Sequence, residues 1–189
     1  MRTDLRRSLR RIRPDARVGT LARRADGELP FIGPADGAGP PLLLDTCVYI
    51  DALEGALPPA VETALRTRTL VHLPLVVAEL SHNFGRLDPR DPRTAAHLGQ
   101  LAGLIGDIPD HRLERDVSPG VLLEAGIVSG LLFRLGGLAP GRETAALVDA
   151  TLFLHALERG FTVLTRNIRD FDFLLQIVPA GRVLLYRAV

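Results

Sequence analysis

Four carboxylates interrupt otherwise apolar stretches of this sequence. Asp45 stands in LLLDTCVYI, Glu79 in PLVVAELSHNF, Asp149 in AALVDATLFL, and Asp170 follows the apolar segment FTVLT. Because an unpaired charge is costly to bury, each acid needs a compensating partner. Taken singly, each could be a helix cap, half of an ion pair or a satisfied core acid. Taken together, the four predict one acidic site.

The chemistry of such a site follows from its ligand types. Several negative charges in one cleft repel one another, and a divalent cation removes that repulsion. Hard oxygen ligands, without paired histidines or a cysteine cluster, favour Mg²⁺ or Mn²⁺ over zinc. Two such ions can activate a water and stabilise a phosphoryl transition state. The acids therefore predict metal-dependent hydrolysis of a phosphodiester.

The segments that carry the acids predict an α/β fold. PLLLDT (residues 41–46) indicates a buried strand, because its apolar residues run without polar alternation, as in a parallel sheet covered on both faces. FTVLTRN, GRVLLYRAV and, more weakly, HRLERDV (residues 111–117) indicate further strands. Helical patterns lie between them, the clearest at residues 141–160, which ends at Gly160. Strands that alternate with helices are typical of a parallel sheet.

This scaffold allows the acids to meet. Asp45 lies at the carboxyl end of the first predicted strand, the edge where open α/β sheets bind ligands. Asp170 follows a later strand by a few residues and can reach the same edge. Glu79 lies early in the helix after a strand, and Asp149 interrupts the apolar surface of its own helix.

The first 40 residues differ from the rest of the chain. They carry nine Arg against five acids, whereas residues 41–189 carry 14 Arg against 17 acids. Their later part is rich in Gly, Pro and Asp, which is typical of a linker. We expect residues 1–40 to be a flexible basic arm and linker, and residues 41–189 to be the folded domain. The alternative is an arm that binds nucleic acid or folds on a partner.

Composition limits the class of protein. A chain of 189 residues that is 47% hydrophobic and 24% charged is expected to be globular. We expect no membrane span, because the apolar runs are shorter than about 18 residues, and no secretory signal. With Cys47 as the single cysteine, no internal disulfide can form, and a cytoplasmic location is expected. Residues 121–138 are more apolar than one helix face needs, which predicts either an extra buried helix or a partner groove or dimer interface.

The acidic segments together resemble the motifs of the PIN-domain family, specifically its VapC-type toxins. The matching segments, in order, are LLLDTCVYID, VVAELSHNFGRL, LVDATLFLHALERG and TVLTRNIRDFDFLL. The resemblance covers roughly residues 41–185. It implies a doubly wound α/β/α sandwich around a mostly parallel central sheet. It also implies a Mg²⁺- or Mn²⁺-dependent endoribonuclease, the toxin of a type II toxin–antitoxin pair, held in check by a small cognate antitoxin and usually homodimeric.

The resemblance also assigns residues to the site. The catalytic and metal-binding acids it implies are Asp45, Glu79, Asp149 and Asp170. Of these, the first and third are the expected direct ligands, and the other two act partly through bound water. Thr165 and Asn167 are placed at the rim by the same motif. Arg166 and Arg169, beside that rim, are expected to hold the RNA backbone, because Arg contacts phosphate well.

Two alternatives and one departure accompany this interpretation. The position commonly occupied by Asn in these toxins is Cys47 here, and a thiol is a weak hydrogen-bond donor. We otherwise expect that cysteine to be a small buried hydrophobe. The chain could instead be an inactive PIN-like scaffold that binds RNA or protein, or a PIN nuclease of RNA processing. The remaining acids that we expect to be solvated or helix-capping are Asp51, Glu54, Asp88, Asp91 and Asp172.

Overall fold

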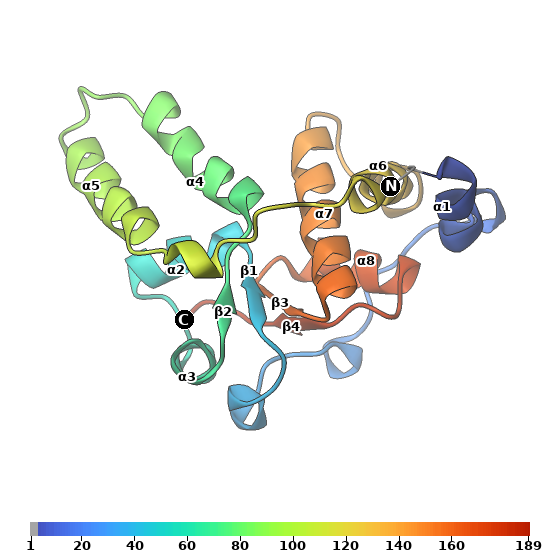
Figure 1. The fold of residues 1–189 in the computed structure, drawn as a ribbon, viewed down its shortest axis with the longest axis horizontal. Coiled ribbons are helices and arrows are strands. Elements are labelled where there is room, and N and C mark those ends of the chain that lie inside the picture. The colour runs from blue at the N-terminus through green and yellow to red at the C-terminus, as the bar shows by residue number, and fades with distance from the viewer. Residues whose placement is uncertain (1–3) are drawn as a thin grey trace.

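The computed structural model describes residues 4–189, and a four-stranded parallel sheet lies at its centre (Figure 1). The strands are β1 Leu42–Leu44, β2 Leu70–Val71, β3 Thr162–Thr165 and β4 Val183–Leu185, in the order β2-β1-β3-β4. Every pairing in this sheet is parallel. The predicted α/β fold with a mostly parallel central sheet is confirmed.

The helices connect these strands and cover the sheet. They are α1 Leu5–Ile12, α2 Thr46–Glu54, α3 Pro59–Thr67, α4 Pro74–Arg86, α5 Pro92–Gly106, α6 Pro119–Gly136, α7 Glu143–Arg159 and α8 Ile168–Ile177. Short 3-10 turns occur at Pro14–Ala16, Asp26–Glu28, Pro34–Gly37 and Asp110–Arg112. Helices α6, α7 and α8 pack against one another, whereas α4 and α5 form a hairpin that extends to one side (Figure 1).

The two central strands owe their burial to their composition. All three leucines of β1 are at most 4% exposed, and all four residues of β3 are buried. Continuous apolar runs suit such strands, because both faces of the sheet are covered. The predicted strand at residues 111–117 is wrong: Leu113 makes one isolated bridge, to His72. Only two residues separate the end of strand β2 from Pro74, the first residue of α4. The edge of the sheet is therefore too short there for residues 111–117 to pair as a strand.

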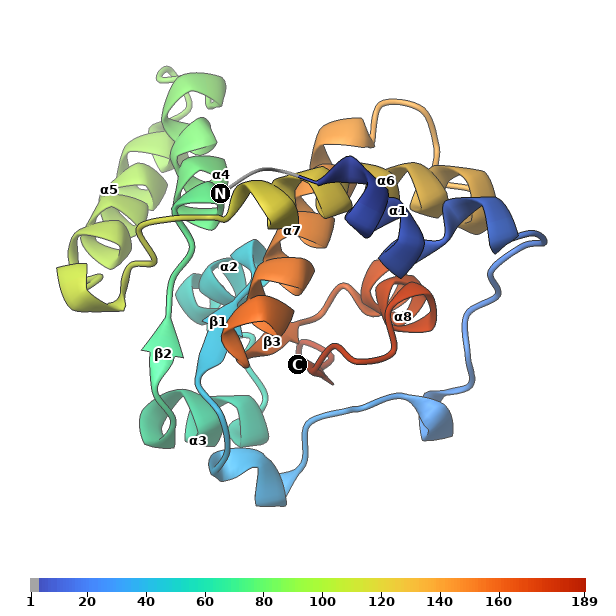
Figure 2. The same cartoon turned by 45° about the vertical axis from the view of Figure 1, so that its right-hand side comes forward.

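The described part of the basic arm, residues 4–40, packs along the domain (Figure 2). Ile12 is 1% exposed, and the amide of Leu21 donates to the carbonyl of Leu135 at 2.7 Å. Further on, the arm meets the β4 edge, where the amide of Ile32 donates to the carbonyl of Leu185 at 2.8 Å. Covering that edge protects backbone groups that could otherwise pair with another chain.

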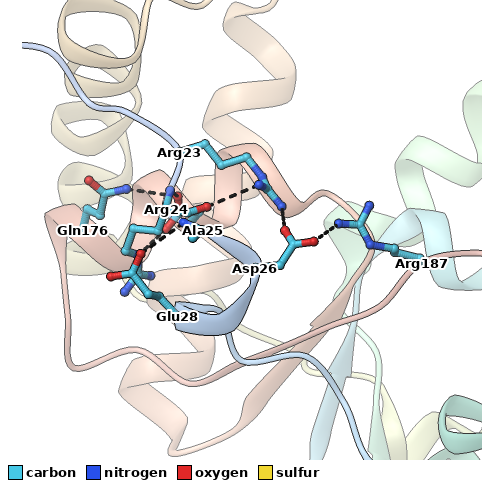
Figure 3. Close-up of polar contacts among 8 residues, drawn as sticks. Arg23, Arg24, Ala25, Asp26, Glu28, Gln176 and Arg187 are labelled. Carbon is cyan, nitrogen blue, oxygen red and sulfur yellow. Dashed lines mark hydrogen bonds and ion pairs between the residues drawn. The ribbon is translucent and has the colours of Figure 1, made fainter.

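Charged groups also hold the arm in place (Figure 3). Arg24 donates to Asp172 from its backbone amide at 2.9 Å and from Nε at 2.6 Å. Asp26 accepts hydrogen bonds from both Arg23 and Arg187. The division into an arm (residues 1–40) and a domain (residues 41–189) stays a prediction, as does the arm's flexibility. The hydrogen bonds and ion pairs described above nevertheless join residues 4–40 to specific residues of the domain.

Helix α6 is long and apolar enough, by length and composition alone, to cross a membrane, which the sequence analysis did not anticipate. Here it packs as a core helix: Val128 and Leu132 are fully buried. Its end lies close to α8, since a Cβ added at Gly136 would sit 2.8 Å from Phe173 Cδ2. Of the two expectations for residues 121–138, the structure contains the buried helix, with Leu122 left 50% exposed.

Candidate active site

Asp45 connects the sheet to the site. Its amide donates to the carbonyl of Leu164 at 3.1 Å, so its backbone continues the pairing of β1 with β3. Its side chain then caps α2, where Oδ1 accepts from the amide of Thr46 at 2.7 Å. Oδ2 accepts from Thr165 Oγ1 at 2.5 Å. A carboxylate at the end of a buried strand is therefore fixed by the start of the next helix.

Asn167 joins two further acids to this group. Its backbone amide donates to Thr165 Oγ1 at 2.9 Å, and its side chain caps α8. From Nδ2 it donates to Asp149 Oδ2 at 3.0 Å and to Asp170 Oδ2 at 3.2 Å. Thr165 and Asn167, predicted at the rim, thus lie between the acids and space them.

The fourth acid comes from α4. Glu79 Oε2 accepts a hydrogen bond from Thr46 Oγ1 at 2.6 Å, and the glutamate is half-buried. Because the amide of Thr46 also donates to Asp45 Oδ1, a single hydrogen-bonded network includes all four predicted acids. They reach it from the end of β1, from α4, from α7 and from the start of α8. The structure therefore brings together every acid that the sequence placed in one site.

The electrostatics of this network are unfavourable to its own charges. Burial raises the pKa of Asp149 well above its usual range, and the carboxylates of Asp45, Asp170 and Glu79 raise it further. Burial also raises the pKa of Asp45, against the hydrogen bonds from Thr165, Cys47 and Thr46. The pKa of Glu79 is raised by burial and then by Asp45. The acids thus repel one another in a setting that is largely shielded from water.

Arg142 is the site residue that the sequence analysis missed. It immediately precedes α7, and its NH2 donates to Asp170 Oδ2 at 2.9 Å, while half of its side chain is exposed. The guanidinium also lowers the pKa of Asp149. The signal in the sequence was its position, directly before the helix that carries Asp149 and seven residues, about two helical turns, from that acid.

The two arginines predicted to bind RNA have protein partners. Arg166 NH1 lies 2.8 Å from Oδ1 of Asp51, and Arg169 NH2 donates to the carbonyl of Gly136 at 2.8 Å. The guanidinium of Arg169 also lies over the ring of Phe173, 5.5 Å from its centroid. Both are exposed beside the acidic network, and their contact with RNA stays a prediction.

Beneath the network, Asp51 is fully buried, so its prediction as a solvated or capping acid is wrong. Tyr186 donates to its Oδ2 at 2.6 Å, and Arg166 lies on its other oxygen. Cys47 lies one turn earlier on α2 and donates from Sγ to Asp45 Oδ2 at 3.2 Å. Burial, aided by Asp45, raises the pKa of this thiol to about 12, so it stays protonated. Cys47 is thus a hydrogen-bond donor to the acid as well as a packing residue.

The donor set suits an oxygen-preferring cation. Four carboxylates, two hydroxyls and one carboxamide are ligands that Mg²⁺ and Mn²⁺ accept. Within residues 4–189, however, no three His, Cys, Asp or Glu side chains are arranged as they stand to hold a metal ion. Their oxygens are turned toward Thr46, Thr165, Asn167 and Arg142 instead. The chemistry therefore fits such an ion, and binding it requires these side chains to exchange partners.

Comparison with known proteins identifies the fold. No family model matches the sequence, and no curated protein matches it. A chain in the crystal structure of VapBC2 from Rickettsia felis, bound to a DNA fragment from their promoter, superposes with a TM-score of 0.50. It is 21% identical, over 78% of this chain and 99% of that chain. A chain of DNA-bound VapBC from Salmonella typhimurium reaches 0.46 at 21% identity, over 77% of this chain and 97% of that one. The first likeness confirms the VapC-type PIN fold that the motifs predicted.

Proposed function

We propose that this protein is a metal-dependent endoribonuclease, and that it acts as the toxin of a type II toxin–antitoxin pair. The observation that carries the proposal is the convergence of Asp45, Glu79, Asp149 and Asp170 in one hydrogen-bonded network at the carboxyl ends of β1 and β3. Ligand sites of open α/β sheets lie at this edge. The VapC-type fold supports the same conclusion.

Each acid has a role that its setting suggests. Asp45 and Asp149 would hold Mg²⁺ or Mn²⁺ directly, because they lie on the two sides of the Thr165–Asn167 link and neither has a guanidinium as a hydrogen-bond partner, whereas Asp170 is paired with Arg142. Glu79 and Asp170 lie at the two ends of the network and would complete the site partly through water. When bound, the cation supplies charge neutralisation and activation of the attacking water.

The neighbouring side chains position the acids rather than react. Thr165 and Cys47 donate to Asp45 Oδ2 and restrict how its carboxylate turns. Asn167 keeps Asp149 and Asp170 apart by donating to both. Arg142 lies at the exposed side of Asp170, where a phosphate oxygen could replace the carboxylate as its partner. With these donors in place, the network would bind the RNA phosphate and the metal ion together.

Cleavage of RNA by the purified full chain tests the proposal. A 5′-fluorescein RNA should be cut internally in Mn²⁺ or Mg²⁺, and EDTA should stop the reaction. D45N and D149N should abolish cleavage, whereas D88N, which changes an exposed acid paired with Arg90, should not. Full activity in either site variant would contradict the mechanism.

The toxin assignment adds a partner and a cell location to the proposal. The similar solved structures are VapBC complexes bound to DNA, so we propose that a small cognate antitoxin holds this chain in check. We also propose a homodimer in the cytoplasm, with no membrane partner. Expression should arrest growth, and co-expression of an adjacent small reading frame should relieve the arrest. Cleavage in vitro without growth arrest would favour a nuclease of RNA processing.

An inactive scaffold is the second candidate, and one observation favours it. The acids already have protein partners, including the guanidinium of Arg142, and among residues 4–189 no metal-binding set is formed as the side chains stand. A scaffold of this kind would bind RNA or protein without cutting RNA. Mn²⁺ separates the two cases, because a working site should raise the melting temperature and a vestigial one should not.

A further inference from the structure

Helix α1 carries arginines whose side chains have no partner within residues 4–189. Arg6, Arg7 and Arg10 lie on the helix and Arg13 caps its end, and all four are exposed. Their side chains form no hydrogen bond or ion pair with any other residue in 4–189. Arginines elsewhere are mostly engaged: Arg90 and Arg93 pair with nearby aspartates, for example, and Arg68 donates to backbone carbonyls.

The four charges lie close together in the sequence, and none of them forms an ion pair within residues 4–189. Arg6 and Arg10 are four positions apart, and Arg10 is three from both Arg7 and Arg13, so they share one side of the helix. Like charges at these spacings destabilise a helix, and this one is too short to be stable alone. A polyanion along this side would convert the repulsion into attraction.

The conformation of Arg13 points the same way. Its φ of 53° lies in the left-handed region, and within the described residues no other non-glycine residue has a positive φ. Glycine or asparagine usually occupies this helix-capping position, because a side chain is strained there. Arg13 and Arg10 line a hollow of about 380 Å³ together with Leu9, Pro14 and Asp15. The Arg13 side chain thus occupies a position whose backbone geometry favours glycine, which has no side chain.

Other contacts fix α1 on the domain without using these four arginines. Arg11 NH1 lies 2.8 Å from Glu124 of α6, and Ser8 and Ile12 are buried. Asp4 caps the helix by accepting from the amide of Arg7. The helix is therefore anchored by one side, and its basic side is left for another molecule.

A line of contacts leads from this basic side to the acidic network. Arg134, near the end of α6, donates to the carbonyl of Arg17 at 3.2 Å, just beyond α1. On the same last turn of α6, Gly136 accepts from Arg169, which directly precedes Asp170. Arg134 and Arg169 are exposed, and an Arg with one donor in use keeps others for phosphate.

We propose that Arg6, Arg7, Arg10 and Arg13 bind the phosphate backbone of the RNA substrate outside the cleavage site. The substrate would then be a strand long enough to reach both α1 and the acids, rather than a few nucleotides around the cut. The choice of RNA rests on the proposed function, whereas the presence of a polyanion-binding face does not. The face lies in the arm, outside the part of the chain that resembles VapC-type toxins.

Binding measured without cleavage tests this proposal. Fluorescence anisotropy of 5′-fluorescein polyuridine RNAs of 4, 12 and 24 nucleotides is followed in the D149N background over a series of salt concentrations. The test variant is R6Q/R7Q/R10Q, because Gln is also a good helix former. The matched control is R66Q/R90Q/R93Q, which removes three exposed arginines that already have carboxylate partners. A second test variant, R13G, removes a charge while placing glycine where it fits without strain.

We expect the α1 triple variant to lose about tenfold or more in affinity for the longest RNA near 100 mM salt. Its plot of log affinity against log salt should flatten by about 2, as expected for three lost phosphate contacts on a single strand. R13G should flatten the plot by a smaller amount, and the matched control should resemble the parent. The 4-nucleotide RNA should bind the parent and the triple variant alike.

Four results would overturn the proposal. They are an unchanged salt slope in the triple variant, an equal loss in the matched control, an equal loss for the shortest RNA, and a larger effect on 24-base-pair duplex DNA than on RNA. Stronger displacement of RNA by poly-glutamate than by unlabelled RNA would instead assign the face to an acidic protein. The binding assay in the D149N background does not depend on cleavage. A wild-type protein that fails to cut RNA would therefore refute the proposed function and leave the binding result unchanged.

Discussion

Two pairs of buried aspartates in this protein meet opposite surroundings. Asp51 and Asp172 are fully buried, and each faces a guanidinium, from Arg166 and Arg24 respectively. Asp45 and Asp149 are nearly as buried, at 6% and 8% exposed, but meet hydroxyls, an amide and other carboxylates. Burial alone therefore does not mark a functional acid, because a paired buried charge can be purely structural. What marks Asp149 is that three like charges raise its pKa further, beyond the increase that burial causes.

One fold therefore keeps both kinds of acid within a few residues of each other. Asp170 belongs to the acidic network, whereas Asp172, two residues later on α8, points to the basic arm. Asp45 and Asp51 differ in the same way: the first caps α2, and the second lies six positions later within it. In each pair the first acid lies at the helix start and belongs to the acidic network, to which Arg142 contributes a contact with Asp170. The second acid is fully buried and faces a guanidinium outside that network.

The two kinds of aspartate should differ most in catalysis. D149N should lower RNA cleavage roughly 1,000-fold, since a lost ligand of a catalytic cation removes several kcal/mol of transition-state stabilisation. D172N should keep most of its activity when rates are divided by the folded fraction, which circular dichroism measures. Equal losses in the two variants would mean that the two kinds of acid do not differ in function.

Stability should respond in the opposite order. D172N should lower the free energy of unfolding by about 3 kcal/mol, because it leaves Arg24 beside a buried neutral group. D149N should leave stability unchanged or raise it in metal-free buffer, because it removes repulsion from three carboxylates. Urea titrations measure both, and D88N, in an exposed pair, should change stability by less than about 1 kcal/mol. A D149N protein less stable than D172N would break the comparison.

Metal binding should follow the same division. Saturating Mn²⁺ should raise the melting temperature of the wild-type protein by roughly 5 °C, as expected for a ligand at about 100 times its Kd in a chain of this size. D149N should lose this shift, and D172N should keep it from a lower starting temperature. Differential scanning fluorimetry with an EDTA control measures the shifts. An unchanged shift in D149N would place the metal elsewhere.

The sequence could predict the acidic network because its determinants are local. A carboxylate at the end of a buried strand and another in an apolar helix are visible in a single segment each. The alternation of strands and helices then predicts that the carboxyl ends of the strands lie at the same edge of the sheet. Arg142 was within reach of the same reasoning, since it directly precedes α7 and lies about two helical turns before Asp149.

The arm and its partners could not be predicted in this way. Arg24 and Asp172 are 148 positions apart, and no local pattern connects them. Residues 17–40 contain Gly, Pro and charged residues that are typical of a linker, and they are held mainly by backbone pairing with β4 and by such distant ion pairs. For the same reason Asp51 and Asp172 could not be distinguished from solvated acids, because their partners come from other parts of the chain.

His155 extends the comparison to a buried base and gives the smallest expected effect. It is fully buried, with Nε2 3.1 Å from Glu114 Oε2 and Nδ1 without a partner among the described residues. Burial lowers its pKa, and it outweighs the opposing effect of Glu114. As pH falls below about 6.5, the unfolded chain therefore binds a proton before the folded chain does, and stability is lost.

Urea titrations between pH 7.5 and 5.5 measure this loss. H155Q should lose less stability over that range than the wild-type protein, whereas H82Q, at an exposed position on α4, should follow the wild type. His72 is also buried, and burial lowers its pKa too, so part of the pH dependence should remain in H155Q. A steeper loss in H155Q would mean that the pair with Glu114 stabilises the charged form. In that case His155 would belong with Asp172, as a buried charge satisfied by its partner.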